Sequence, residues 1–427
     1  GTNITTADEN TGIGSDALTD TTTGKYNTAV GKSALYKNTT GQYNVAVGYR
    51  ALVGNTTING NVAVGSNTLT SFSYTGSANT AVGHHAAQNI TSGYRDTYMG
   101  DYAGNSTTTG YENTLIGSQT GYSQTTANGN TSIGYKAGYA VTTGATNVLV
   151  GWEAGKSITT ANYCSAVGAT ALDALTTGNN NTAFGYGALG SVTTSVQNVA
   201  VGAYALSNNT GTKNVATGSS ALFSNTSGEF NSSYGHQAGR DITEGDYNTI
   251  LGANAGNSGT NDLTTGSNNI IIGYQAAASA ATVSNEITLG DTNITKFRIP
   301  GINVVFKDNG GTPTNGHVLT VDANGEAGFA AASGGGGLSS DSQFNTVGGT
   351  NAGDSFSGTN ATNNTLIGYD AGTAITEGDN NSVLGYDAGQ AISTGDKNSF
   401  FGASAGYSTT TADKNVAIGS SALYSNT

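Results

Sequence analysis

Charge, proline and cysteine are all scarce in this chain. Of its 427 residues, 14 are Lys or Arg and 27 are Asp or Glu, so charged residues make up 10% of the chain and the net charge is −13. Soluble globular domains usually carry roughly 25% charged residues. Because the few basic residues are scattered, a nucleic-acid-binding groove is disfavoured, and we expect no nucleic-acid partner.

Long apolar runs and cysteine pairs are also missing. No run reaches the roughly 18 apolar residues that a membrane-spanning helix needs. Cys164 is the only cysteine, which excludes a disulfide framework or a Cys-based zinc site within one chain. Met99 is the only methionine and the chain stops within a repeat at Thr427, so we expect a fragment or a processed form.

The sequence is dominated instead by glycine and by a repeat. Glycine occurs 65 times, and a motif such as Asn-Thr-Ala-Val-Gly at 27–31 recurs in 22 units with a period of about 17 residues. The motif glycines are Gly14, Gly31, Gly48, Gly65, Gly83, Gly100, Gly117, Gly134, Gly151, Gly168, Gly185, Gly202, Gly218, Gly235, Gly252, Gly273 and Gly290, then Gly349, Gly368, Gly385, Gly402 and Gly419. This period is too short for two helices and too long for a hairpin alone. We therefore predict an all-β chain in which each unit forms one coil of a parallel β-solenoid, or β-roll.

Each column of the repeat has a physical interpretation. The residue before the motif glycine is usually large and apolar, such as Val30, and two residues earlier lies a Thr, Val or Ile that shares its face and is expected to be buried. Between them lies a mostly Ala column (Ala29), and a second Ala column follows three residues after the glycine (Ala34). We interpret this pattern as a thin coil in a homotrimer, with three chains packed about one axis and an Ala column facing the partners. A single-chain left-handed β-helix is the alternative.

An asparagine lies four residues before the motif glycine in 19 of the 22 units. The exceptions are Asp96, Cys164 and Glu286. Stacked asparagines in a β-coil form a ladder whose amides bond to the next rung and to turn backbone. Cys164 is expected to be a tolerated small residue in this ladder. Thr-Thr-Gly stretches such as 22–24 are predicted turns, because glycine supplies positive φ.

Two solenoid blocks are predicted, separated by an interruption. Residues 1–290 hold 17 repeats, residues 291–344 form the interruption, and residues 345–427 hold five more repeats. Within the interruption, 294–299, 304–306 and 318–321 are predicted short strands, with turns at 308–311 and 322–325 and a Gly-rich linker at 333–337. With a rise of about 4.8 Å per rung, the first block would form a rod of roughly 80 Å.

Units such as NTAVGKSAL at 27–35 and NVAVGYRAL at 44–52 resemble two groups of fibrous proteins. One is the head repeat of trimeric autotransporter adhesins, which implies left-handed parallel β-rolls with three chains side by side. The other is the shaft repeat of tailed-phage tail fibres, often followed by an intramolecular chaperone domain. FRIPG at 297–301 and GHVLT at 316–320 resemble the segment that often follows such shafts. The longer coils with Thr-Thr-Gly turns match the phage shafts better, although the repeat resumes after the interruption and no chaperone domain is visible.

Few residues suggest catalysis or metal binding. His84 and His236 share one column nine coils apart, and His84-His85 has no carboxylate spaced to close a metal site. Asp370 and Asp387 hold equivalent positions on adjacent coils, and carboxylates about 5 Å apart would suit a retaining glycosidase. A repeated surface column, which also includes Glu153, explains them without catalysis. We therefore expect no catalytic residue, cofactor or metal site.

The most informative surface feature is an aromatic residue directly after the motif glycine in seven units. These candidate surface-contact residues are Tyr49, Tyr135, Trp152, Tyr186, Tyr274, Tyr369 and Tyr386. Charged or small residues take the same column elsewhere, which indicates that it faces solvent. Exposed rings suit contact with a sugar or protein surface. Cross-rung stacking that stiffens the rod is the alternative, while an ice-binding Thr array is disfavoured because the Thr column alternates with Val and Ile.

Together these patterns predict an extracellular, non-enzymatic fibre. We expect the homotrimeric shaft of a phage tail fibre, a virion component that acts as a rigid spacer and host-surface adhesin. Its expected partners are two further copies of itself and a glycan or protein of the host cell surface. A cellular trimeric surface adhesin head is the main alternative, and a polysaccharide-degrading tailspike is the third.

Overall fold

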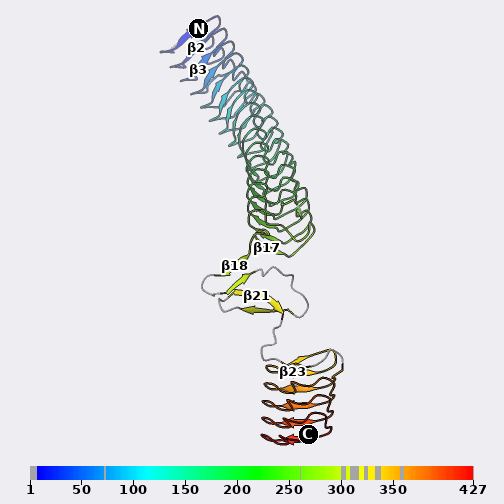
Figure 1. Ribbon diagram of the computed structural model, residues 1–427. Helices are drawn as coiled ribbons and strands as arrows, with labels where there is room; N and C mark the ends of the chain where they lie inside the picture. The colour runs from blue at the N-terminus through cyan, green and yellow to red at the C-terminus, as the bar shows by residue number, and fades with distance from the viewer. Residues whose placement is uncertain are drawn as a thin grey trace. The chain divides into compact units, whose positions relative to one another are not determined.

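The computed structural model describes residues 7–71, 74–259, 261–299, 304–307, 317–321, 326–331, 338–355 and 360–426. Within these ranges every regular element is a β-strand, and no helix is found that could cross a membrane. The chain divides into two compact units, Gly1–Ile294 and Thr295–Thr427. The predicted all-β class and the parallel solenoid with coils of about 17 residues are confirmed (Figure 1).

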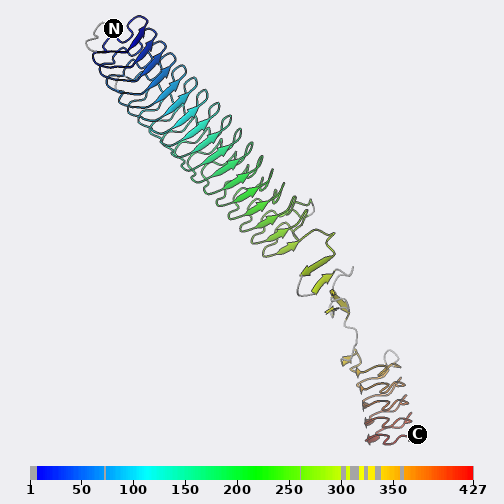
Figure 2. The same ribbon diagram turned by 90° about the vertical axis from the view of Figure 1, so that its left-hand side faces the viewer.

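Seventeen three-residue strands form one parallel sheet along the first unit (Figures 1 and 2). They are β1 (Thr11–Ile13), β2 (Thr28–Val30), β3 (Val45–Val47), β4 (Val62–Val64), β5 (Thr80–Val82), β6 (Thr97–Met99), β7 (Thr114–Ile116), β8 (Thr131–Ile133), β9 (Val148–Val150), β10 (Ser165–Val167), β11 (Thr182–Phe184), β12 (Val199–Val201), β13 (Val215–Thr217), β14 (Ser232–Tyr234), β15 (Thr249–Leu251), β16 (Ile270–Ile272) and β17 (Ile287–Leu289). Each strand pairs in register with the next, so that Ala29 lies opposite Ala46 and Val30 opposite Val47. Every coil therefore adds one rung to the sheet.

Residues with positive φ turn the chain at fixed places in each coil. In the coil that contains β3 they are Tyr43 at 59°, Arg50 at 57° and Leu52 at 51°. The motif glycine is needed for a further reason, because Gly31 has φ 130° and a Cβ there would lie 2.5 Å from the carbonyl oxygen of Gly48. Successive coils thus approach too closely at this column for any side chain.

The interior of each coil is filled by the central strand residue and by the residue six positions later. In the β3 coil a small Ala46 is paired with Leu52, and both are fully buried. In the β9 coil a large Leu149 is paired with Gly155, where a Cβ would lie 2.7 Å from Cδ2 of Leu149. The two positions therefore share one limited volume, which admits one bulky side chain.

Two sequence predictions about which strand residues point into the coil are wrong. Both Ala columns are fully buried inside the coil of their own chain, as Ala29 and Ala34 show, so no Ala column faces a partner. The residues that flank the central position, such as Thr28 and Val30, are only half-buried. The Thr/Val/Ile column, expected to be buried, thus lies on the outside of the single chain. The reason is steric, because the narrow interior admits only a small central side chain beside a Leu.

The asparagine ladder is confirmed. The backbone N–H of Asn44 donates to Oδ1 of Asn27 on the preceding rung at 3.0 Å, and Nδ2 of Asn44 donates to the carbonyl oxygen of Ile58 at 2.8 Å. Asn27 repeats the second bond with the carbonyl oxygen of Gly41 at 2.8 Å. Since both asparagines are buried, these bonds pair their side-chain amides with backbone groups inside the protein.

The second unit holds two further sheets. The first contains β18 (Lys296–Ile299), β19 (Val304–Lys307), β20 (His317–Val321) and β21 (Glu326–Ala331), of which β21 was not predicted. The predicted turns at 308–311 and 322–325 and the linker at 333–337 lie outside the described residues. The second solenoid block contains β22 (Ser339–Ser340), β23 (Thr346–Gly348), β24 (Thr365–Ile367), β25 (Ser382–Leu384), β26 (Ser399–Phe401) and β27 (Val416–Ile418). From β23 to β27 the strands again pair in parallel.

Candidate functional site: the outer surface of the solenoid

The first candidate surface is the outer sheet face, which we define as the first and third residues of strands β1 to β17. Figure 2 shows these strands stacked along the first block. Large apolar side chains that are exposed on this face are Ile13, Met99, Ile133, Val148, Phe184, Val201, Tyr234, Leu251, Ile270, Ile287 and Leu289. Soluble monomers rarely expose contiguous apolar patches larger than a few hundred Å². These side chains lie on ten of the 17 strands and on every strand from β14 to β17.

The second candidate surface is the aromatic column directly after the motif glycine. All seven predicted residues are exposed, from 40% for Tyr135 to 62% for Tyr274. Five of them contact a ring on a neighbouring rung. Tyr369 and Tyr386 stack with centroids 5.4 Å apart, Tyr135 and Trp152 with centroids 6.4 Å apart, and Tyr186 meets Tyr204 edge-on at 5.1 Å.

Tyr49 and Tyr274 occupy the same column without an aromatic residue in it on either adjacent coil. Lys32 and Ser66 flank Tyr49 in the column, and Ala253 and Asp291 flank Tyr274. Rings that stack on a neighbouring rung and rings without an aromatic neighbour in the column thus occur in the same column. Contact of the seven residues with a host surface stays a prediction.

Sequence reasoning missed further aromatic stacks on other columns. Their ring centroids are 4.8 to 5.2 Å apart. The pairs are Tyr26 with Tyr43, Tyr94 with Tyr111, Tyr122 with Tyr139, Phe230 with Tyr247, and Tyr407 with Tyr424. Each pair is 17 residues apart in sequence, so a search for aromatics at the repeat period would have found them.

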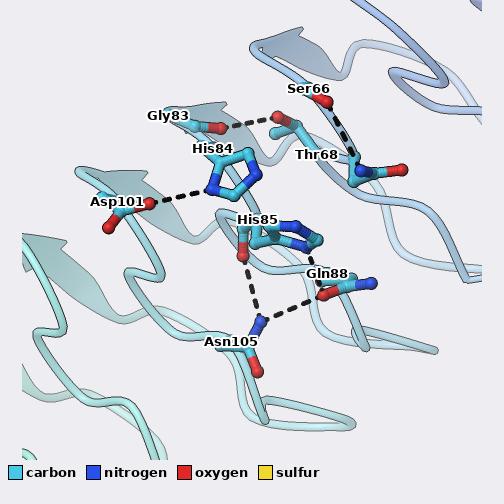
Figure 3. Close-up of polar contacts among 9 residues, drawn as sticks. Ser66, Thr68, Gly83, His84, His85, Gln88, Asp101 and Asn105 are labelled. Atoms are coloured by element: carbon cyan, nitrogen blue, oxygen red, sulfur yellow. Dashed lines mark hydrogen bonds and ion pairs between the residues drawn. The ribbon is translucent and has the colours of Figure 1, made fainter.

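His84 and His85 form a compact polar cluster with side chains around them (Figure 3). Nδ1 of His84 lies 3.1 Å from Oδ1 of Asp101 on the next coil, and Nδ1 of His85 lies 2.6 Å from Oε1 of Gln88. Asn105 donates to the carbonyl oxygen of His85 at 3.3 Å. His236, in the same column as His84, is exposed on a distant coil. Across the described ranges, no group of three or more His, Cys, Asp or Glu side chains is placed to hold a metal ion.

The carboxylates of the suggested glycosidase pair lie on adjacent coils. Asp370 and Asp387 both have φ 53°, and the backbone N–H of Asp387 donates to the carbonyl oxygen of Tyr369 at 2.9 Å. Burial, and then the charge of Asp370, raise the pKa of Asp387. Glu153, the third member of the column, forms an ion pair with Lys156 at 3.1 Å. Nδ2 of Asn351 donates to Oδ1 of Asp370 at 2.8 Å, whereas Oδ1 of Asp387 is buried without a hydrogen-bond partner.

The three exceptions in the asparagine ladder adapt differently. Asp96 accepts from the backbone N–H and Nδ2 of Asn113 at 2.8 and 3.0 Å, its Oδ2 is buried without a partner, and burial raises its pKa to about 7. Cys164 is buried, with Sγ 3.4 Å from the carbonyl oxygen of Gly178, and burial raises its thiol pKa. The hydroxyl of Ser279 donates to Glu286 and holds its pKa below the usual value.

No protein-family model matches the chain, and no curated protein matches it.

Proposed function

We propose that this chain is the homotrimeric shaft of a phage tail fibre, which holds a binding surface at a distance from the virion and contacts the host cell. The proposal assigns no reaction to the chain. A regular rod of stacked coils suits a spacer, because each coil is supported by its neighbours over any length. The resemblance of the repeat to tail-fibre shafts supports the phage setting, the extracellular location and the number of chains.

The outer sheet face is the observation that carries the proposal. Its exposed apolar side chains lie on ten of the 17 rungs, including every rung from β14 to β17. Identical chains packed in parallel and in register would present the same side chains to one another at each of these rungs. Burial of such a strip is favourable by about 25 cal/mol per Å² of apolar surface. A threefold axis along this face would cover the strip on all three chains. In this arrangement bulky side chains such as Phe184 and Leu251 face the axis.

The solution mass tests the assembly. Light scattering on a size-exclusion column should give three times the 42.6 kDa chain mass. Leu251→Lys places a charge on the outer sheet face and should reduce the trimer to monomers. Ser219→Lys is the matched control, because Ser219 is exposed in the column after the motif glycine and lies off that face. A monomeric or dimeric wild-type chain would contradict the homotrimer, as would equal masses for the two variants.

The virion location is tested with antibodies raised against the chain. Immunogold labelling should mark the tails of phage particles in electron micrographs. Labelling of a cell surface in place of phage tails would overturn the phage setting and favour a cellular adhesin.

A further inference from the structure

One coil of the first block is longer than all the others. The unit from Gly252 to Gly273 has 21 residues, and its four extra residues fall within 257–262. The coil closes again where the N–H of Leu263 donates to the carbonyl oxygen of Gly256 at 3.0 Å. In repeat proteins, insertions into single repeats form loops on one face, which is often the binding face.

Ser258 and Asn261, which belong to this stretch, line a cleft near β17. Strand β17 is labelled in Figure 1. The cleft has a volume of about 520 Å³, within the roughly 300–1,000 Å³ of ligand pockets. Ser258 and Asn261 come from the insertion, Gln275 from the following coil, and Thr288 and Asp291 from β17 and the residues after it. The cleft thus lies within the first unit and joins three successive segments of the chain.

The chemistry of the cleft is that of amides and hydroxyls. No Lys or Arg is among the residues that line it. The carboxylate of Asp291 is held by Asn293, whose backbone N–H and Nδ2 donate to it at 3.0 and 2.8 Å. Oγ of Ser258 is buried and has no hydrogen-bond partner in the protein. A buried hydroxyl without a partner destabilises the fold, and rotation of the Ser258 side chain into the cleft would let it bond to a polar ligand.

We propose that this cleft binds a neutral oligosaccharide. Sugar hydroxyls both donate and accept hydrogen bonds, which matches side-chain amides and hydroxyls that do the same. An anionic sugar is disfavoured because the only charged group that lines the cleft is a carboxylate. The biological meaning of this site rests on the proposed role in host attachment, where the oligosaccharide belongs to the cell surface.

The test is binding of the 427-residue chain to immobilised oligosaccharides, both neutral ones and sialylated or sulfated ones. The wild-type chain should be retained by at least one neutral oligosaccharide. Gln275→Ala and Asn261→Ala should each weaken this binding at least tenfold. Gln237→Ala is the matched control, because Gln237 holds the same place in its coil as Gln275, with φ 53° against 54°, and does not line the cleft. It should bind as the wild type does.

Three results would overturn the site: no retention on any neutral oligosaccharide, retention on anionic ones only, or equal binding by wild type and both cleft variants. Solution mass and thermal unfolding of each variant show whether it folds. If one of the two cleft variants does not fold, the other still tests the site, because the two residues lie in different segments. The proposed function fails separately, through a non-trimeric mass or an absence of label on phage tails.

Discussion

Asp96 differs from the asparagines above and below it in the ladder by its ability to ionise. A ladder asparagine such as Asn113 donates Nδ2 to a turn carbonyl, that of Ala127, at 3.0 Å. A carboxylate has no proton to donate there, whereas a protonated Asp96 carries one and imitates the amide. Burial raises the pKa of Asp96 to about 7, so the proton stays on in the folded state well above the usual range.

The stability of the first block is expected to fall as pH rises, because of Asp96. Below about pH 4 the Asp96 carboxyl is protonated in both the folded and the unfolded chain, so its ionisation does not change the free energy of unfolding. Between about pH 4 and pH 7 only the unfolded chain releases the proton, so the folded state loses relative stability, and above pH 7 the loss is complete. Asp96→Asn should therefore raise the free energy of unfolding at pH 8 by on the order of 4 kcal/mol and change it little at pH 4.

Thermal unfolding of wild type and Asp96→Asn at the two pH values measures this difference. The reverse change two rungs away, Asn130→Asp, is the control and should lower the melting temperature more at pH 8 than at pH 4. A gain from Asp96→Asn that is the same at both pH values would show that ionisation is not the cause.

Within one coil, the size of the central strand residue is related to the size of the residue six positions later. Where the central strand residue is Ala, as at Ala166, Leu172 fills the interior six residues later. Where it is large, as at Leu115, a glycine stands in the second position, and a Cβ on Gly121 would lie 2.6 Å from Cδ1 of Leu115. In these coils one large and one small residue share the interior, whereas the β5 coil holds two small ones, Ala81 and Ala87.

A swap of the two sizes in the β9 coil tests this relation. Leu149→Ala leaves a cavity and should cost about 2–5 kcal/mol, and Gly155→Leu overpacks the coil and should cost about 1–3 kcal/mol. The double variant recreates the Ala166 and Leu172 pair of the next coil, so its cost should fall below the sum by more than about 1 kcal/mol. Denaturant unfolding of the four proteins measures the coupling, and additive costs would mean that the two positions do not share space.

The period and the ladder could be predicted from sequence, but the facing of the strands could not. Asn27 and Asn44 are 17 residues apart, so one column predicts both the coil and its hydrogen bonds. A three-residue strand such as Thr28–Val30 is too short for alternation to show its inner side. Hydrophobicity alone would predict that Val30 is buried. In the structure Ala29 is buried instead, because the interior of the coil is too narrow for the larger side chain. The cleft beside Gln275 could not be predicted either, since the sequence shows the insertion but not the residues that fold around it.

The two compact units have separate apolar cores. The buried cluster of the second solenoid block includes Leu366, Val383 and Phe400, all of which lie in the second unit. In repeat arrays each coil is stabilised mainly by its neighbouring coils. A substitution that destabilises one solenoid block is therefore expected to have little effect on the stability of the other. The chain as a whole is thus expected to unfold in more than one step.

Phe400→Ala tests the independence of the two units. Loss of this fully buried ring should cost about 3–5 kcal/mol in the second solenoid block. Amide hydrogen exchange should rise across β24 to β27 and stay unchanged across β1 to β17. Leu172→Ala should give the converse pattern. Faster exchange in both blocks from either variant would show that they unfold as one.

The register of the rungs also bears on how such a molecule can change over generations. Removing or duplicating one 17-residue unit would rejoin strand to strand, asparagine to asparagine and glycine to glycine, with no contact of a new kind. Recombination between the repeated gene segments that encode these units can therefore alter the reach of the rod in steps of about 4.8 Å. The number of repeat units, and with it the length of the rod, can therefore evolve without new kinds of contact between coils.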